Sequence, residues 1–381
     1  MYWRPYVLDV IYKYLDCGDL HHGFARVKCN DCHHEYLLPF SCKKRNFCPS
    51  CHQKRVIEFG EQLHEAVLEK TPHRQWVFSV PKRLRPYFMY DRKLLSKLSL
   101  CAWRVLSEYL KASVSADDPV PGCVIAVQTF GEFLNFNPHL HIIATNGCFY
   151  GDGGFMTGIS PNAADREAAF AIEVFDMLKK ERKISRIVID NMNTWQYSGF
   201  NVYCGSPMEL WDDEGLERLA QYIVRAPFSQ ERMTYIPEQE SPNGVAKVVY
   251  EGKTSMVGEA FTALDWAGRR HGLLLAHASR LARLVTHIPG KGEQMVRYYG
   301  YYSNKSHGSR NKEILMHLDL WTMSYDPPSE GKDRIAIHIQ SHRSFEWWEA
   351  VNHASSNNIY NDRILQTPYE DEYSQLTPYE Y

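Results

Sequence analysis

The stretch Asn135-Phe136-Asn137-Pro138-His139-Leu140-His141-Ile142-Ile143-Ala144 decides how the rest of this 381-residue chain is interpreted. In a β-strand successive side chains point to opposite faces, so His139 and His141 share one face while Leu140 enters a core. Two imidazoles side by side on a sheet can hold one metal ion. A His-x-His pattern also arises by chance, so its meaning depends on whether the rest of a metal-dependent site is encoded.

An apolar segment, Cys123-Val124-Ile125-Ala126-Val127-Gln128-Thr129-Phe130, precedes the histidine strand. We expect the two segments to pair as an antiparallel hairpin. Gln128 lies 11 residues before His139 and 13 before His141, so it can face them and offer its amide oxygen as a third ligand. Glu132 is the competing oxygen donor. Two imidazoles and one oxygen, with other positions left to water and phosphate, suit Mg²⁺ or Mn²⁺ acting on a phosphodiester.

The segment from Leu216 to Pro227 is predicted to be a helix that carries a candidate nucleophile. Its apolar stripe consists of Leu216, Leu219, Ala220 and Ile223. Arg218, Tyr222 and Arg225 fall on the opposite, polar face. The tyrosine pKa is ordinarily about 10, so a tyrosine needs positive charge nearby to act as phenolate at neutral pH. A plain surface tyrosine is the competing interpretation, because the chain has 24 tyrosines.

Two cysteine pairs near the N-terminus predict a structural zinc site. Cys29-x2-Cys32 and Cys48-x2-Cys51 are separated by 15 residues, a spacing typical of a tetrahedral four-cysteine site. Four thiolates leave the metal no open position, so this zinc would be structural. Cys42, His33, His34 and His52 are possible substitutes for these ligands or a second site, with surface or packing roles as the alternative, and we expect Cys17 to be buried.

Charge and clustering of basic residues point to nucleic acid. The net charge is −2, but 10 acidic and 4 basic residues lie between 321 and 381, so the remainder of the chain carries +4. Basic clusters, some interleaved with aromatic rings, suit contacts to phosphates and bases. We expect DNA contacts from Lys43, Lys44, Arg45, Arg83, Arg85, Arg297, Tyr298 and Tyr299. Solvated faces and a packed aromatic strand end are the alternatives.

The remaining pattern is that of an ordinary globular chain. Helices are expected over residues 5–16, 56–71, 94–114 and 161–184, and strands over 75–81 and 201–205. No apolar run approaches the length needed to cross a bilayer, and residues 1–5 do not resemble a signal peptide. We therefore expect a cytoplasmic protein with no membrane partner.

These motifs together resemble the transposases of the insertion sequence 91 family, which belong to the HUH endonucleases. The resemblance runs from about residue 1 to about residue 310. It is carried by Cys48-Pro49-Ser50-Cys51, Gln128-Thr129-Phe130-Gly131, Pro138-His139-Leu140-His141, Tyr222-Ile223-Val224-Arg225, and His287-Ile288-Pro289 through Tyr298-Tyr299-Gly300.

The resemblance implies an α+β fold: the palm-like antiparallel sheet of HUH endonucleases with flanking helices, preceded by a four-cysteine zinc ribbon. It implies that His139, His141 and Gln128 hold the catalytic Mg²⁺ or Mn²⁺, and that Tyr222 is the nucleophile with Arg225 beside it. The implied reaction nicks and rejoins single-stranded DNA at element ends and target site through a 5′-phosphotyrosine, in rolling-circle-like transposition. The implied reaction needs no ATP and takes place in the bacterial cytoplasm, at the nucleoid. The protein is a possible homo-oligomer.

Two departures from the family pattern are visible. Some members carry two tyrosines four residues apart, whereas the earlier position here is Arg218, so we expect a single-tyrosine enzyme. The chain has no cysteine after Cys204, and its acidic end lacks core periodicity. We predict a zinc-binding domain over 1–72, a catalytic domain with a basic C-terminal segment over 73–315, and a poorly ordered or aberrant tail over 316–381. The rival interpretations are a replication initiator or relaxase with the same chemistry, and a non-catalytic zinc-ribbon DNA-binding protein.

Overall fold

The computed structural model describes residues 4–30, 32–131, 134–151, 153–158, 163–208, 212–228, 233–240, 247–250, 283–306 and 308. The tail predicted over 316–381 lies outside the described residues. Within the described part, no helix is both long enough and apolar enough to cross a membrane.

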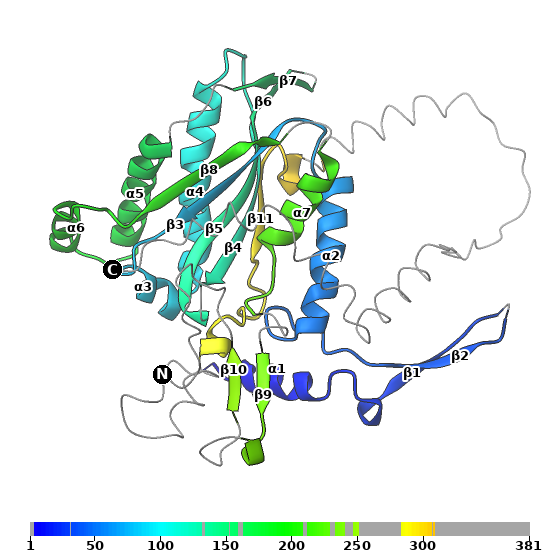
Figure 1. Ribbon diagram of the computed structural model, residues 1–381. Coiled ribbons are helices and arrows are strands. Elements are labelled where there is room, and N and C mark those ends of the chain that lie inside the picture. Colours follow the sequence, from blue (N-terminus) through cyan, green and yellow to red (C-terminus); the bar gives the residue numbers. More distant parts are fainter. Residues whose placement is uncertain are drawn as a thin grey trace, which may run out of the picture. The chain divides into compact units, whose positions relative to one another are not determined.

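A five-stranded antiparallel sheet organises the chain, in the strand order β11-β4-β5-β3-β8 (Figure 1). Its strands are β3 (His73–Ser79), β4 (Gly122–Phe130), β5 (Phe136–Thr145), β8 (Asn201–Met208) and β11 (Val296–Gly300). Every residue of β4 is buried, and β5 is buried from Leu140 onward. Because both faces of β4 and β5 are covered, these buried stretches are largely continuous apolar runs in the sequence and do not alternate apolar with polar residues. The antiparallel sheet with flanking helices confirms the predicted α+β class.

One face of the sheet packs against the helices α3 (Arg85–Tyr90), α4 (Lys93–Ala112) and α5 (Ala163–Lys180). The sheet contributes alternate residues to this core: Trp76, Phe78, Ile125, Val127, Leu140, Ile142 and Ala144. Each large apolar side chain buried in this way stabilises the fold by about 1.5–3 kcal/mol. Helix α3 lies in a basic, aromatic segment, and it packs on the sheet because Phe88 is buried in this core.

The opposite face packs against α2 (Pro49–Ala66) and α7 (Asp213–Ile223). Val124, Ala126 and Ile143 come from the sheet, and the helices add Leu63, Leu219, Ala220 and Ile223. His139, His141 and Gln128 continue the same alternating rows of β5 and β4. The histidines therefore point toward the side of the sheet against which α2 and α7 pack.

The N-terminal region consists of α1 (Tyr6–Leu15), the short helix η1 (Leu20–His22), and the antiparallel hairpin of β1 (Phe24–Lys28) and β2 (Glu35–Pro39), which leads to α2. Helix α2 begins at Pro49, earlier than residue 56 where we expected it. Cys48 is extended and occupies the position before the helix, and proline is well suited to the first helical position. The second cysteine pair therefore forms the start of this helix.

Smaller elements complete the described chain. They are the hairpin of β6 (Gly147–Tyr150) and β7 (Gly154–Thr157), helix α6 (Arg186–Asn193), the hairpin of β9 (Met233–Ile236) and β10 (Lys247–Tyr250), and η3 (Glu238–Glu240).

Candidate functional site

The two histidines of β5 stand together as the alternation predicts. Nε2 of His139 lies 3.1 Å from Nε2 of His141, and the rings are 4.9 Å apart. Two ligands at right angles around an octahedral ion with bonds of about 2.1 Å lie about 3.0 Å apart. The nitrogen pair therefore already has the separation that one shared cation requires.

Hydrogen bonds at the far side of each ring orient the pair. Nδ1 of His139 lies 2.8 Å from the carbonyl oxygen of Asn137, which accepts its proton and leaves the Nε2 lone pair available. The side-chain amide of Gln75 lies 3.4 Å from Nδ1 of His141, and the Oε1 atom of Gln75 is buried without a partner among the described residues. Exchanging the amide nitrogen and oxygen lets Oε1 accept from Nδ1–H of His141, which again frees Nε2.

Burial keeps both rings neutral. It lowers the pKa of His139 to about 4, with the nearby Arg225 and Arg85 acting in the same direction. Burial also holds the pKa of His141 well below its usual range, aided by the neighbouring His139 and Arg225. Neutral imidazole is the form that binds a metal.

Gln128 occupies the predicted third position. In the β4–β5 register it pairs directly with His139. Its amide nitrogen donates to the carbonyl oxygens of Tyr222 (3.2 Å) and Ile223 (3.0 Å). Its Oε1 atom is buried and has no hydrogen-bond partner among the described residues. A buried acceptor without a donor is costly unless a cation or water pairs with it, so this atom fits a metal ligand. Glu132, the alternative donor, lies outside the described residues.

Helix α7 brings Tyr222 to the histidines. Asp212 caps the helix by accepting from the N–H of Gly215 at 2.9 Å. The ring of Tyr222 lies 5.2 Å from that of His141, in an edge-to-face arrangement. The prediction that Tyr222 lies on the polar face of the helix is wrong, because its ring packs against the core shared by α2, α7 and the sheet. Arg218 does lie on the outer face, paired with Glu214 at 3.2 Å.

Arg225 follows the helix and covers the tyrosine. Its guanidinium carbon lies 4.6 Å from the ring centre of Tyr222 and 5.7 Å from that of Phe130. Nε of Arg225 is buried without a hydrogen-bond partner among the described residues. A positive charge with an unused donor therefore stands beside the tyrosine and the two histidines, where an anionic group would be stabilised.

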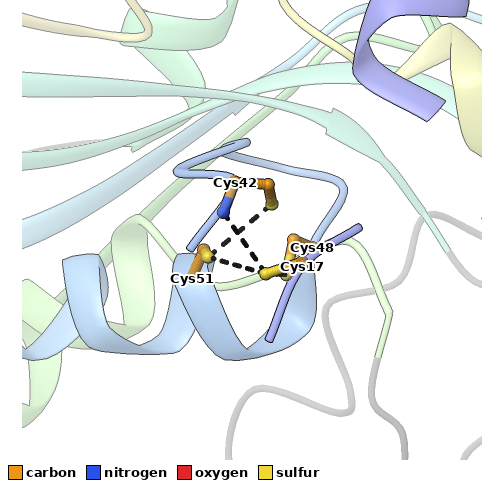
Figure 2. A group of neighbouring side chains, drawn as sticks. All are labelled: Cys17, Cys42, Cys48 and Cys51. Atoms are coloured by element: carbon orange, nitrogen blue, oxygen red, sulfur yellow. Dashed lines mark hydrogen bonds between the residues drawn. The ribbon is translucent and has the colours of Figure 1, made fainter. Parts of the chain in front are cut away.

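Four cysteines form a compact cluster, but not the predicted set (Figure 2). Sγ of Cys17 lies 3.8 Å from that of Cys48 and 3.6 Å from that of Cys51, and Sγ of Cys42 lies 3.7 Å from that of Cys51. A tetrahedral zinc ion with bonds of about 2.3 Å places its sulfur ligands about 3.8 Å apart. The cluster therefore fits one zinc ion.

The thiols of this cluster also have the chemistry of a metal site. Burial raises the pKa of Cys42 to about 12 and raises that of Cys48. Burial also acts to raise the pKa of Cys51, but the N–H of Lys43 and the neighbouring thiols outweigh it and lower the value. Four adjacent thiolates repel one another, and a bound divalent cation removes that penalty.

The prediction that Cys29 and Cys32 complete the zinc site with Cys48 and Cys51 is wrong in this structure. The β1–β2 ladder runs from Phe24–Pro39 to Lys28–Glu35, so Cys29 and Cys32 lie at the hairpin tip. Five residues of strand span about 17 Å, far more than one coordination sphere. Cys29 and Cys32 join no group of three or more metal-binding side chains among the described residues.

Cys17 and Cys42 complete the cluster because both lie at the base of that hairpin. The N–H of Gly18 donates to the carbonyl of Phe40 (3.1 Å), and the N–H of Cys42 points at Sγ of Cys17 (3.3 Å). Cys17 was expected to be a buried cysteine, and Cys42 was an alternative ligand. The sequence signal for both was weak, since neither is part of a Cys-x2-Cys pair.

The residues predicted to contact DNA are only partly exposed. Lys43 and Arg83 are exposed, whereas Lys44 pairs with Asp9 at 3.1 Å, and Arg85 and Arg297 are half-buried. Arg45 donates to the carbonyl of Glu293. Tyr299 stacks on Trp103 at 5.4 Å, and Tyr298 packs against the core beside α7. The aromatic part of this set therefore serves packing in the sheet.

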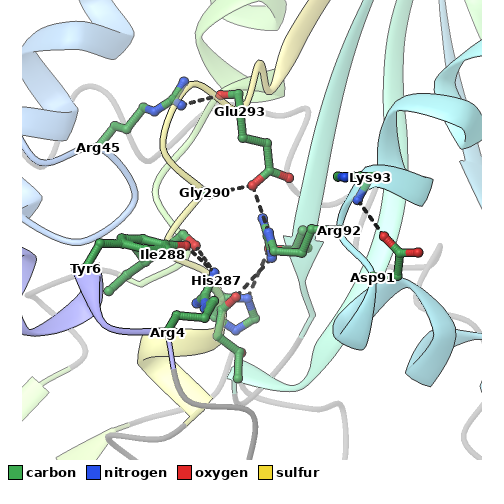
Figure 3. Close-up of polar contacts among 12 residues, drawn as sticks. Arg4, Tyr6, Arg45, Asp91, Arg92, Lys93, His287, Ile288, Gly290 and Glu293 are labelled. Atoms are coloured by element: carbon green, nitrogen blue, oxygen red, sulfur yellow. Dashed lines mark hydrogen bonds and ion pairs between the residues drawn. The ribbon is translucent and has the colours of Figure 1, made fainter.

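Arginines around the His287-Ile288-Pro289 motif hold several segments together (Figure 3). Arg92, the residue before α4, binds Glu293 at 2.8 Å, and Arg4 donates to the carbonyl of Ile288 at 2.7 Å. His287 itself is fully buried, with Nδ1 3.1 Å from the hydroxyl of Thr129 and Nε2 3.1 Å from the carbonyl of Leu134. This motif thus fixes the connection between β4 and β5 that precedes the histidines.

Two protein families match the chain. The family described as "Transposase zinc-binding domain" matches residues 1–80, and the family described as "Putative transposase" matches residues 122–310. The first range includes the cysteine cluster, which supports a structural zinc ion there. The second includes Gln128, the two histidines and Tyr222.

Curated relatives point the same way. The transposase for insertion sequence element IS801 from Pseudomonas savastanoi pv. phaseolicola is 23% identical over 344 residues, covering 85% of this chain and 77% of the relative. "Putative transposase y4qJ" from Sinorhizobium fredii is 22% identical over 324 residues, covering 79% and 75%. No solved structure matches the chain.

Proposed function

The chain belongs to the transposases of the insertion sequence 91 family, and we propose that it cuts and rejoins single-stranded DNA through a covalent bond to Tyr222. Family membership supports a DNA-cleaving role. The proposal goes further in naming the nucleophile, the catalytic metal, Mg²⁺ or Mn²⁺, and the single-stranded ends of the element as substrate.

The observation that carries the proposal is the convergence of α7 with the β4–β5 hairpin. The Tyr222 ring lies 5.2 Å from the His141 ring, and Gln128 binds the carbonyl of Tyr222 while its own oxygen has no partner. Tyr222 and His141 are 81 residues apart in the sequence, so local structure does not explain their contact. A tyrosine next to two imidazoles that could hold a cation supplies the nucleophile and the metal ligands that metal-assisted attack on a phosphodiester needs.

In the proposed mechanism each residue has one task. A divalent cation held by His139, His141 and Gln128 would polarise the scissile phosphate and offset its charge. The Tyr222 oxygen gives its proton to solvent and attacks phosphorus in line. The bond from phosphorus to the 3′ oxygen breaks, and that oxygen takes up a proton. The products are a 5′-phosphotyrosine and a 3′-hydroxyl.

Arg225 would stabilise the negative charge that develops during attack. Its guanidinium lies over the Tyr222 ring, beside the place where the attacked phosphate would sit, so it could donate to a phosphate oxygen. The phosphotyrosine link conserves the free energy of the broken bond. Attack on that link by a 3′-hydroxyl then rejoins the strand without ATP, as rolling-circle-like transposition requires.

A nicking assay tests the proposal directly. Wild-type protein is incubated with Mn²⁺ and a single-stranded oligonucleotide from the end of the element, and covalent adducts are resolved on a denaturing gel. We expect an adduct that carries the 5′-phosphate side of the nick, none with Tyr222→Phe, and a normal amount with Tyr197→Phe, a matched change at an exposed tyrosine. An adduct with Tyr222→Phe would refute the assignment of the nucleophile.

The metal assignment has a separate test. The double variant His139→Ala, His141→Ala is expected to bind the oligonucleotide and form no adduct at any Mn²⁺ concentration. Full activity of this variant would refute the metal site while leaving Tyr222 as nucleophile. Absence of any adduct with the wild type would instead favour a non-catalytic DNA-binding protein.

A further inference from the structure

The imidazole of His52 joins the cysteine cluster to the helix that carries Tyr222. His52 is 5% exposed, and its Nε2 lies 2.9 Å from the carbonyl oxygen of Val224. The N–H of Asn46 donates to its Nδ1 at 3.2 Å. Since Nδ1 accepts, the proton resides on Nε2, which donates to Val224. The ring is therefore a neutral bridge with both nitrogens engaged.

Two local contacts fix His52 to the segment that carries three of the cluster's cysteines. Asn46 lies between Cys42 and Cys48, and its φ of 57° holds the loop in a tight left-handed turn. The N–H of His52 donates to the carbonyl of Cys48 at 2.9 Å, in the first turn of α2. His52 also directly follows Cys51. The position of the imidazole is thus set by the same backbone that positions three of the four sulfur atoms.

The other end of the bridge is the terminus of α7, two residues after Tyr222. The carbonyl groups at a helix end lack partners within the helix. Gln128 binds those of Tyr222 and Ile223, and His52 binds that of Val224. Close packing of α2 against α7 supports this geometry, because a Cβ at Gly60 would lie 2.7 Å from Cγ of Gln221.

We propose that His52 is a positioning residue that fixes the end of α7 to the cysteine cluster and so determines where the Tyr222 phenol stands. The inference rests on the proposed function, since it takes Tyr222 as the nucleophile. It gives the cysteine cluster and the start of α2 a role in the chemical step, separate from any role in binding DNA. Loss of the bridge leaves the carbonyl of Val224 unpaired and frees the last turn of α7 to shift.

Two substitutions at His52 of similar polarity provide the test. The amide nitrogen of His52→Gln can take the place of Nε2 and restore the bond to Val224, whereas the shorter His52→Asn reaches only the place of Nδ1. His52→Leu removes both bonds. Each variant is measured for zinc content, for affinity toward the single-stranded oligonucleotide, and for the rate constant and amplitude of adduct formation in a single turnover with Mn²⁺.

We expect His52→Asn and His52→Leu to keep zinc and DNA affinity but to form the adduct about 10- to 100-fold more slowly, because small misplacement of a reacting group has a large kinetic cost. His52→Gln should recover most of the wild-type rate constant. A purely structural role would instead lower the amplitude, through a smaller folded fraction, and leave the rate constant unchanged. That result, or equal rate constants for His52→Gln and His52→Asn, would overturn the inference.

The two proposals fail in distinguishable ways. If the wild type forms no adduct, the proposed function is refuted and the inference about His52 falls with it. If the wild type forms the adduct and Tyr222→Phe does not, while His52→Asn matches the wild-type rate constant, the inference alone is refuted.

Discussion

Replacing Cys17 by serine tests which cysteines hold the structural zinc. The sulfur of Cys17 lies within 3.8 Å of those of Cys48 and Cys51, so the substitution removes one corner of the tetrahedron. We expect the variant to lose zinc. Cys29→Ser combined with Cys32→Ser is the matched control, because these residues lie at the tip of the β1–β2 hairpin and should not be needed for this site.

The expected loss of stability follows from the length of the loop that the zinc ion closes between Cys17 and Cys42. Cys17 and Cys42 are 25 positions apart. Cross-linking a loop of about 25 residues removes unfolded-state entropy worth about 3.5 kcal/mol at 25 °C. With an unfolding entropy of about 2.1 cal/mol/K per residue over roughly 300 residues, this lowers Tm by about 5–6 °C. Loss of the metal from the remaining ligands would add to that value.

Zinc per chain is measured by mass spectrometry after gel filtration, and Tm by calorimetry. We expect about one zinc ion per chain in the wild type and in the Cys29→Ser, Cys32→Ser control, at the same Tm, and less zinc with a lower Tm in Cys17→Ser. Retention of zinc by Cys17→Ser together with its loss from the control would refute the assignment. It would restore the ligand set predicted from the Cys-x2-Cys spacing.

Three further outcomes follow from the contacts around Tyr222 and from two buried histidines. Gln128→Leu leaves the carbonyl of Ile223 at the end of α7 without its donor, whereas that of Tyr222 keeps the N–H of Arg225. An unpaired buried carbonyl costs about 1–3 kcal/mol, so urea unfolding should show a loss of about that size and the Mn²⁺-dependent adduct should disappear; wild-type activity would contradict its role. Arg225→Gln should slow adduct formation about 10- to 100-fold with a much smaller change in DNA affinity, because a charge that acts on the transition state is removed; an effect on affinity alone would contradict this. Burial lowers the pKa of His73 and of His287 to about 4, below the unfolded value of about 6.5. Between these values the unfolded state binds more protons, so the stabilisation from these two neutral rings should be fully present above pH 6.5. Its loss alone should lower the free energy of unfolding by about 3–4 kcal/mol between pH 7 and pH 5; a flat profile by urea unfolding would contradict the assignment.

The sequence predicted the parts of the site that depend on local periodicity. His139 and His141 share a face because strand side chains alternate, and Gln128 pairs with His139 because a short connection fixes the register of a hairpin. The apolar stripe of the helix that carries Tyr222 was also correct for Leu219, Ala220 and Ile223, which are buried. In each case the decisive residues lie within one element or two neighbouring ones.

The sequence could not reveal contacts that depend on how distant elements pack. Gln75 contacts His141 although the two residues are 66 positions apart in the sequence. The sequence marked Gln75 only as a polar residue within an otherwise apolar strand. Tyr222 was assigned to a polar face because periodicity gives the direction of a side chain relative to its helix, but not what lies opposite. The sheet places His141 there, so the ring is half-buried.

The sequence by itself therefore determined the fold class, the histidine strand and the existence of a cysteine-based metal site. The tertiary structure decided which cysteines form that site, since a hairpin of fixed length carries Cys29 and Cys32 away and leaves Cys17 and Cys42 at its base. It also decided that the site is joined to the Tyr222 helix through His52. Sequence spacing specifies geometry within an element, whereas contacts between distant elements are fixed by the packing of α2, α7 and the sheet around a shared core.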